Sequence, residues 1–182
     1  MAGIFAVLLV LQAASTQAGT PPPPPPAPTP AATCEGGHFD EFDFWVGQWD
    51  VYPTGKDQIV AHSRIEKLYG GCALRENWMP LKGAGGGSLS GYDPRTGGWH
   101  QTWFGSSPGP VFFSGGLASG QMVLTGSWPG SGPKGEDGLT RMTYSRLENG
   151  AVRQHGEFSG DYGVTWQTSF DLTYRPHEEP HA

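Results

Sequence analysis

Residues 42–51 read Phe-Asp-Phe-Trp-Val-Gly-Gln-Trp-Asp-Val and carry the strongest fold signal in the chain. With the period of two of a β-strand, one face of this stretch carries Trp45, Gly47 and Trp49. A glycine between two large aromatic side chains marks a close backbone approach or a sharp bend, as in the first strand of a closed barrel. The stretch therefore predicts a fold with an interior.

The residues that follow continue as short strands separated by turns. Turn dipeptides recur throughout, 29 glycines are spread through the chain, and helix signals are nearly absent apart from a short candidate at 35–42 that would plug or cap one end. The predicted strands span 45–52, 58–68, 73–79, 87–92, 99–105, 111–117, 121–128, 139–147, 152–158 and 164–174. Strands joined in chain order predict an all-β, up-and-down antiparallel barrel of about 8–10 strands, with a two-sheet sandwich as the alternative.

The first part of the chain is expected to lie outside this domain. Residues 1–18 hold an apolar run too short to span a bilayer and end in a small-residue cleavage pattern, which predicts a signal peptide and an exported, periplasmic or extracellular protein; an uncleaved anchor is the alternative. Residues 19–33 form a proline-rich linker, read as a spacer or as a docking ligand. The barrel domain is predicted to span 34–176, with a polar tail at 177–182, and no transmembrane segment is expected in the mature protein.

The net charge of the chain indicates which macromolecules it is not expected to bind. The formal net charge is −6 and no Lys/Arg cluster is present, so binding to nucleic acid or to an anionic membrane is not expected.

Cys34 and Cys72 predict a disulfide in an exported chain, stabilising the fold by roughly 4 kcal/mol in the chain-entropy model. Two free thiols or a metal site are the alternatives, and no metal site is expected from two cysteines without a pair of histidines at suitable spacing.

The predicted inward faces mix large aromatic side chains with polar ones. A buried polar group without a partner costs several kcal/mol, so such groups must pair or must meet water or a ligand. This mixture is typical of a small-molecule pocket. The expected ligand contacts are Trp78, Trp103 and Trp166 for stacking, and Glu76, Gln101, Arg141 and Gln154 for orienting a polar group. A filled barrel, in which Glu76 pairs with Arg141, is the alternative.

Several segments together resemble a family of uncharacterised exported bacterial proteins. The matching stretches are 42–51, 70–78, 92–103, 152–154 and 159–166, so the likeness covers nearly the whole domain. Members of that family are similar to the calycins, lipocalin-like barrels that open with a short helix and a Gly-x-Trp strand, here Gly47 and Trp49. The resemblance implies a barrel with a ligand cavity and supplies no activity or catalytic residues.

A related branch, the nitrobindin-like barrels, holds haem through a histidine near the C-terminal end. The last predicted strand, 164–174, contains no histidine. His100 and His155 alternate with Gln101 and Gln154, so they are expected to face solvent. No cofactor is therefore expected, and His177 and His181 are expected to lie in a solvated polar tail, with weak binding of a divalent metal by that tail as the alternative.

The function predicted is an exported barrel that binds a small hydrophobic or amphipathic ligand, with its oligomeric state left open. The P-loop motif is absent from the sequence, and neither a nucleophile elbow nor a zinc-protease helix is predicted. An enzyme of isomerase or cyclase type, with Glu76 as acid or base and Arg141 as an anion holder, is one alternative. An extracytoplasmic interaction module that exposes Phe112 or Phe113 is another.

Overall fold

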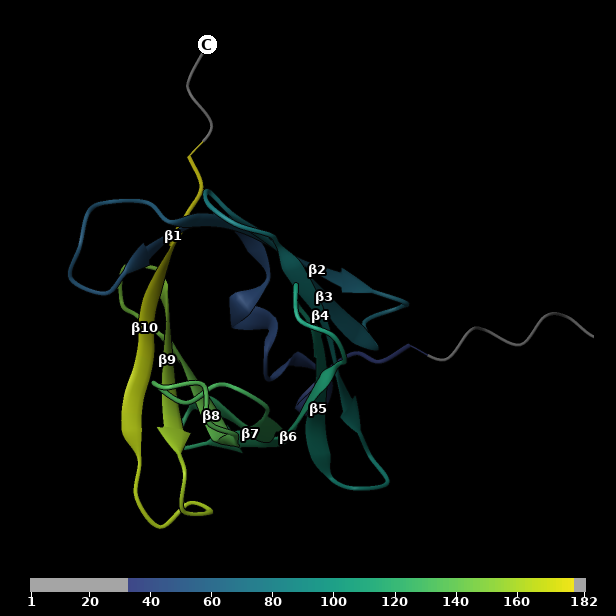
Figure 1. Cartoon of the computed structure of the whole chain (residues 1–182). Helices are drawn as coiled ribbons and strands as arrows, with labels where there is room; N and C mark the ends of the chain where they lie inside the picture. The colour runs from purple at the N-terminus through teal and green to yellow at the C-terminus, as the bar shows by residue number, and fades with distance from the viewer. Residues whose placement is uncertain (1–32, 179–182) are drawn as a thin grey trace, which may run out of the picture. The chain divides into compact units, whose positions relative to one another are not determined.

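A computed structural model describes residues 33–178 and contains two short 3₁₀ turns followed by ten strands (Figure 1). The elements are η1 (Gly37–Asp40), η2 (Asp43–Trp45), β1 (Gly47–Pro53), β2 (Ala61–Leu68), β3 (Ala73–Pro80), β4 (Gly86–Asp93), β5 (Gly98–Phe104), β6 (Val111–Ala118), β7 (Gln121–Trp128), β8 (Gly138–Arg146), β9 (Val152–Ser159) and β10 (Gln167–Pro176). The predicted signal peptide and nearly all of the predicted linker lie outside the described residues, as do the last four residues of the predicted tail. Across residues 33–178, no helix is long and apolar enough to cross a bilayer.

The strands form a closed antiparallel barrel in simple chain order. Each strand pairs with the next one along the chain, and β1 also pairs with β10, which closes the ring. Closure leaves no unpaired edge strand, the usual weak point of an open sheet. The predicted up-and-down barrel is thus confirmed, and the two-sheet sandwich is wrong.

The helix predicted at 35–42 forms only as the short turn η1, which has no buried residue, and a second turn, η2, follows it and buries Trp45. Because Trp45 belongs to the second turn, the first strand begins at Gly47 rather than at Trp45. The fully buried Phe42 stacks on Trp45 with 5.0 Å between ring centroids and meets Tyr144 edge-on at 4.9 Å. Aromatic pairs of this kind contribute about 0.5–1.5 kcal/mol each beyond their buried area. The opening motif therefore fills one end of the barrel.

Gly47 is required by the tryptophan that follows it. The backbone at Gly47 has φ of +154°, and a Cβ there would lie 3.1 Å from a ring carbon of Trp49. The indole of Trp49 folds back over this glycine and donates its Nε1–H to the carbonyl of Trp45 at 2.9 Å. A side chain at position 47 would displace the ring, which explains the glycine between the two tryptophans.

The helical turns are fastened to the barrel by covalent and ionic contacts. Cys34 and Cys72 form the predicted disulfide, which joins the chain before η1 to the β2–β3 connection. Lys67 of β2 contacts Asp40 at 2.7 Å and Asp43 at 2.6 Å. These links hold the aromatic plug in place and leave the other end of the barrel to the cavity described next.

Candidate ligand-binding cavity

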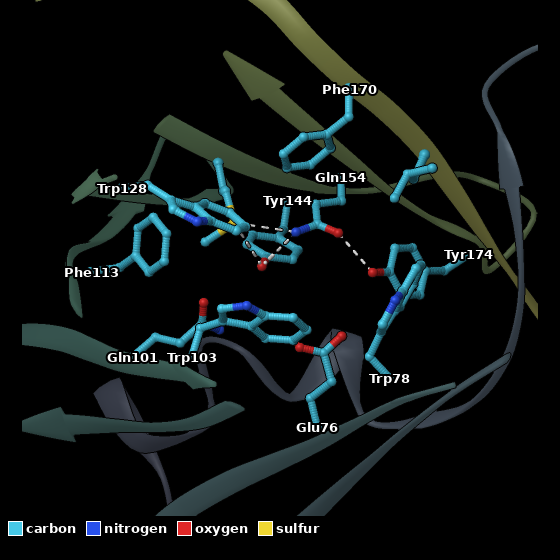
Figure 2. Close-up of a pocket in the computed structure, with 12 residues that line it drawn as sticks. Glu76, Trp78, Gln101, Trp103, Phe113, Trp128, Tyr144, Gln154, Phe170 and Tyr174 are labelled. Carbon is cyan, nitrogen blue, oxygen red and sulfur yellow. Dashed lines mark hydrogen bonds between the residues drawn. The ribbon is translucent and has the colours of Figure 1, made fainter. Parts of the chain in front are cut away.

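The barrel contains a cavity of about 200 Å³ whose wall is built by seven strands, β3 and β5 to β10 (Figure 2). Its lining consists of Glu76, Trp78, Gln101, Trp103, Phe113, Trp128, Met142, Tyr144, Gln154, Phe170, Leu172 and Tyr174. Five of the seven side chains expected to contact a ligand are brought together here, namely Glu76, Trp78, Gln101, Trp103 and Gln154. Their placement follows from the predicted alternation of β3, β5 and β9, and their role as ligand contacts stays a prediction.

Three tryptophans lie where the cavity meets an outer hollow. Trp78, Trp103 and Trp128 stand near the ends of β3, β5 and β7, three strands that run in the same direction. The ends of alternate strands in an antiparallel barrel meet at one rim. The same three side chains also line a second hollow of about 170 Å³, together with residues of the β3–β4 and β5–β6 loops. A molecule passing from that hollow into the cavity would pass the three indoles.

A carboxyl group is buried in the wall of this cavity. The Glu76 side chain points into the cavity beside Trp78 and Trp103 (Figure 2), and the residue is only 7% exposed. Ser63 donates a hydrogen bond to Oε1 at 3.3 Å, and Ser88 donates one to Oε2 at 3.0 Å. Burial raises the pKa of Glu76 from 4.5 to about 7, although the two hydroxyl groups act in the opposite direction. The carboxyl group therefore changes charge near neutral pH.

A glutamine links two buried tyrosines on the opposite side of the cavity (Figure 2). Gln154 donates from Nε2 to the hydroxyl of Tyr144 at 2.9 Å and accepts at Oε1 from the hydroxyl of Tyr174 at 2.7 Å. Burial raises the pKa of both tyrosines well above 10, so both stay neutral. Gln101, a further lining residue, donates from Nε2 to the Ser90 hydroxyl at 3.0 Å, so the cavity offers several polar positions on apolar walls.

The inward placement expected for Arg141 is wrong. Met142 and Tyr144 line the cavity from β8, so Arg141 points to the outer surface. There Arg141 pairs with Glu157, its direct partner on β9, with 2.9 Å from Nε to Oε2. The face of β8 that carries Arg141 is therefore the outer face and not the inner one. The expected pair between Glu76 and Arg141 does not form, and Glu76 accepts hydrogen bonds from Ser63 and Ser88 instead.

Trp166 also lies outside the cavity, and a bulge explains why. Residues 166, 168 and 170 would share one face of a regular strand. The pairing of β10 with β9 shifts between Thr168 and Phe170, which moves Phe170 to the inner face and leaves Thr168 on the outer one. Trp166 precedes β10, donates its Nε1–H to the carbonyl of Gly163 at 3.0 Å and is covered by the Arg141 guanidinium, 4.2 Å from the ring centroid. Arg141 and Trp166 therefore contact each other on the outer wall of the barrel and do not line the cavity.

Seven lining residues on β6, β7, β8 and β10 are not among the expected ligand contacts, although the expected inward face of the last strand includes Phe170. They are Phe113, Trp128, Met142, Tyr144, Phe170, Leu172 and Tyr174. A signal for several of them was present, because Met142 and Tyr144 make their face of β8 more apolar than the face of Arg141. On β10 the alternation of residues 166, 168 and 170 continues to Leu172 and Tyr174, and the bulge removes only Trp166 and Thr168 from that inner face.

The two histidines considered as haem ligands make hydrogen bonds on the outer surface. His100 contacts the hydroxyls of Thr96 at 2.9 Å and Ser114 at 3.3 Å. His155 contacts the hydroxyl of Thr168 at 3.0 Å. Both alternate with glutamines that line the cavity, so their imidazoles point away from it.

Phe112 and Phe113 point to opposite faces of β6. Phe112 is 65% exposed on the outer wall, whereas Phe113 is 1% exposed and lines the cavity. Leu89 of β4 and Phe104 of β5 are exposed as well. The hypothesis of an interaction surface therefore retains Phe112 as its support and loses Phe113.

A scan of the sequence against models of protein families matches none, and a search of curated proteins finds no match.

Proposed function

We propose that this protein binds a small amphipathic molecule inside its barrel. The observation that carries the proposal is the cavity of about 200 Å³, in which indole rings meet a buried glutamate and a glutamine bonded to two tyrosines. Mostly apolar walls with a few convergent polar groups are the usual lining of a small-molecule site. An apolar cavity of about 150 Å³ accommodates benzene. A ligand with one aromatic ring and one polar substituent therefore matches the volume and the lining.

The charge of Glu76 sets which polar substituent is preferred. Below its pKa of about 7 the carboxyl group is neutral and can donate a hydrogen bond to the ligand. Above this pH the carboxylate only accepts hydrogen bonds, repels an anionic ligand and attracts a cationic one. Because Glu76 is buried in the cavity wall, both effects are stronger than they are at the protein surface.

Ligand binding is tested with single-ring probes on the full chain. Phenol, benzoate and benzylamine are titrated against the protein at about pH 6 and about pH 8, either side of the Glu76 pKa, with tryptophan fluorescence and calorimetry as readouts. Phenol is expected to bind one molecule per chain. Benzylamine is expected to gain affinity relative to benzoate at the higher pH, and this gain is expected to vanish in Glu76→Gln.

The matched control is Arg141→Gln, which changes a charged residue on the outer wall of the same barrel. Phenol binding that is equally weak in Arg141→Gln and Glu76→Gln would contradict binding in the cavity, as would the absence of saturable binding for all three probes. Native mass spectrometry of protein from its own source, with an absorption spectrum of the same sample, would identify the natural ligand and would also reveal haem.

We also propose that the chain is exported and that it belongs to the lipocalin-like exported family that it resembles. Export is supported by the disulfide between Cys34 and Cys72, since such bonds persist in oxidising compartments. Membership is supported by Gly47 and Trp49, which occupy the first strand after a short helical segment. Cell fractionation with a C-terminal epitope tag tests export, and a cytoplasmic, reduced protein would contradict it.

A second candidate function is acid–base catalysis by Glu76 on the bound molecule. The observation that favours it is a pKa of about 7 inside a cavity, which is close to the optimum for a general acid or base at neutral pH. Catalysis requires that Glu76→Gln abolish turnover while the affinity for the substrate survives. Equal loss of affinity and turnover would instead assign Glu76 to binding alone.

A further inference from the structure

A second group of polar side chains lies on the outside of the barrel, where the first and last strands meet. Asp50 of β1 and His62 of β2 are direct cross-strand partners. His177 directly follows β10, and its backbone N–H donates to the carbonyl of Gln48 at 2.9 Å, which continues the pairing of β10 with β1. Because residues 48 and 50 share one face of β1, His177 lies diagonally across from Asp50.

The three side chains converge on one oxygen atom. The Nδ1 atom of His62 and the Nδ1 atom of His177 each lie 2.8 Å from Oδ1 of Asp50. The potential ligand atoms of the three residues all lie within 4.8 Å of one another. The side chains of His62 and His177 are 43% and 34% exposed, against 20% for Asp50, so the group is open to solvent on one side.

The two arginines nearest to Asp50 contact other residues, so the charged partners of the Asp50 carboxylate are the two imidazoles. Arg175, the direct partner of Asp50 on β10, lies over the ring of Tyr52 at 4.1 Å and contacts Asp57 at 3.2 Å. Arg64, next on the outer face of β2 after His62, pairs with Glu66 at 2.8 Å. The carboxylate therefore brings one negative charge to two nitrogen donors.

We propose that Asp50, His62 and His177 bind a divalent transition-metal ion of the zinc type on the outer wall of the barrel. Two imidazole nitrogens and one carboxylate oxygen form a donor set that suits zinc, with solvent at the remaining position. Zinc ligands at about 2.0–2.2 Å in tetrahedral geometry lie about 3.4 Å apart. Each imidazole must therefore retreat from Oδ1 by about half an ångström, and the exposure of both rings allows this movement.

Such an ion would strengthen the pairing of β1 with β10 that closes the barrel. His177 lies beyond the end of β10, Asp50 lies on β1 and His62 lies on β2, so the ion would link three chain segments. A metal bound only by the folded state stabilises that state by mass action. The inferred role is a structural clip, separate from the cavity on the other face of these strands.

The experiment titrates zinc and cobalt into the metal-free full chain. Zinc binding is followed by calorimetry and by the shift in thermal unfolding, and cobalt binding is followed by visible absorption, which reports the coordination geometry. The test variants are Asp50→Asn, His62→Gln and His177→Gln. The controls are His100→Gln, an outer-surface histidine outside the group, and His181→Gln, which removes the other histidine of the C-terminal segment.

The expected result is one zinc ion per chain, a rise in the melting temperature and a cobalt spectrum of low coordination number. Each test variant is expected to weaken zinc binding at least tenfold and to abolish the spectrum, while both controls bind as the unmodified chain does. The proposal is overturned if zinc fails to bind at a one-to-one ratio, if the test variants bind as tightly as the unmodified chain, or if His181→Gln alone removes binding.

Discussion

The exchange of Glu76 for glutamine measures the free energy that the buried carboxyl group removes from the folded state at neutral pH. In the native barrel, burial raises the pKa of Glu76 from 4.5 to about 7. The folded protein therefore keeps a proton that the unfolded chain has already released between these two pH values. It follows that the unfolding free energy falls as pH rises from 4.5 to about 7 and stays low above it.

The size of this loss in unfolding free energy follows from the width of the pH range between the two pKa values of Glu76. A difference of one proton between the folded and unfolded states changes the unfolding free energy by about 1.4 kcal/mol per pH unit. Across the range from 4.5 to about 7, the native state loses roughly 3 kcal/mol because of Glu76. Glutamine has nearly the same shape and never ionises, so it can keep hydrogen bonds with Ser63 and Ser88 without this loss.

The assay is urea unfolding of the unmodified chain and of Glu76→Gln, followed by tryptophan fluorescence at a series of pH values from about 4.5 to about 8.5. The two proteins are expected to be similar at the acidic end, and the variant is expected to be more stable by up to roughly 3 kcal/mol at the alkaline end. Glu66→Gln is the control, because a hydrogen bond from Arg75 lowers the pKa of that half-buried glutamate on the outer wall, and its titration lies below this pH range. A stability difference that does not change with pH would refute the reasoning.

Three further predictions concern the disulfide, the first strand and the cavity. Replacing Cys34 and Cys72 together with alanine is expected to cost about 4 kcal/mol of unfolding free energy, from their separation of 38 residues; a loss below about 1 kcal/mol in urea unfolding would contradict it. Gly47→Ala is expected to cost about 1–3 kcal/mol, because its Cβ would meet the Trp49 ring, whereas the unobstructed control Gly116→Ala is expected to cost under about 1 kcal/mol in the same assay. Gln154→Leu is expected to weaken phenol binding about tenfold and Arg141→Gln to leave it unchanged, as measured by calorimetry; equal losses would argue against the cavity as the binding site.

Most of the barrel was predictable because its signals are local. Turn residues and alternating side chains predicted all ten strands in order, with boundaries a few residues from those observed. The alternation of β3, β5 and β9 also placed Glu76, Gln101 and Gln154 inside. Such patterns persist because a strand with one buried face must repeat its side-chain character every second residue.

The errors arose where the alternation of one strand had two interpretations or was interrupted. Both faces of β8 mix apolar and polar residues, and in the structure the more apolar face of Met142 and Tyr144 turns inward while Arg141 pairs with Glu157 on the outer surface. On β10 the irregularity between Thr168 and Phe170 reverses the inner and outer faces, which no period-two pattern can follow.

The sequence by itself determined the secondary structure, the disulfide partners and the barrel class, since each depends on spacing along the chain. Only the tertiary structure decided which side chains share the cavity, because the register of β8, β9 and β10 places Gln154 between Tyr144 and Tyr174. Closure of the ring by β1 and β10 brings His177 to Asp50, 127 residues away in the chain. Contacts across a closed sheet depend on register and face, and these are decided by how every strand packs at once.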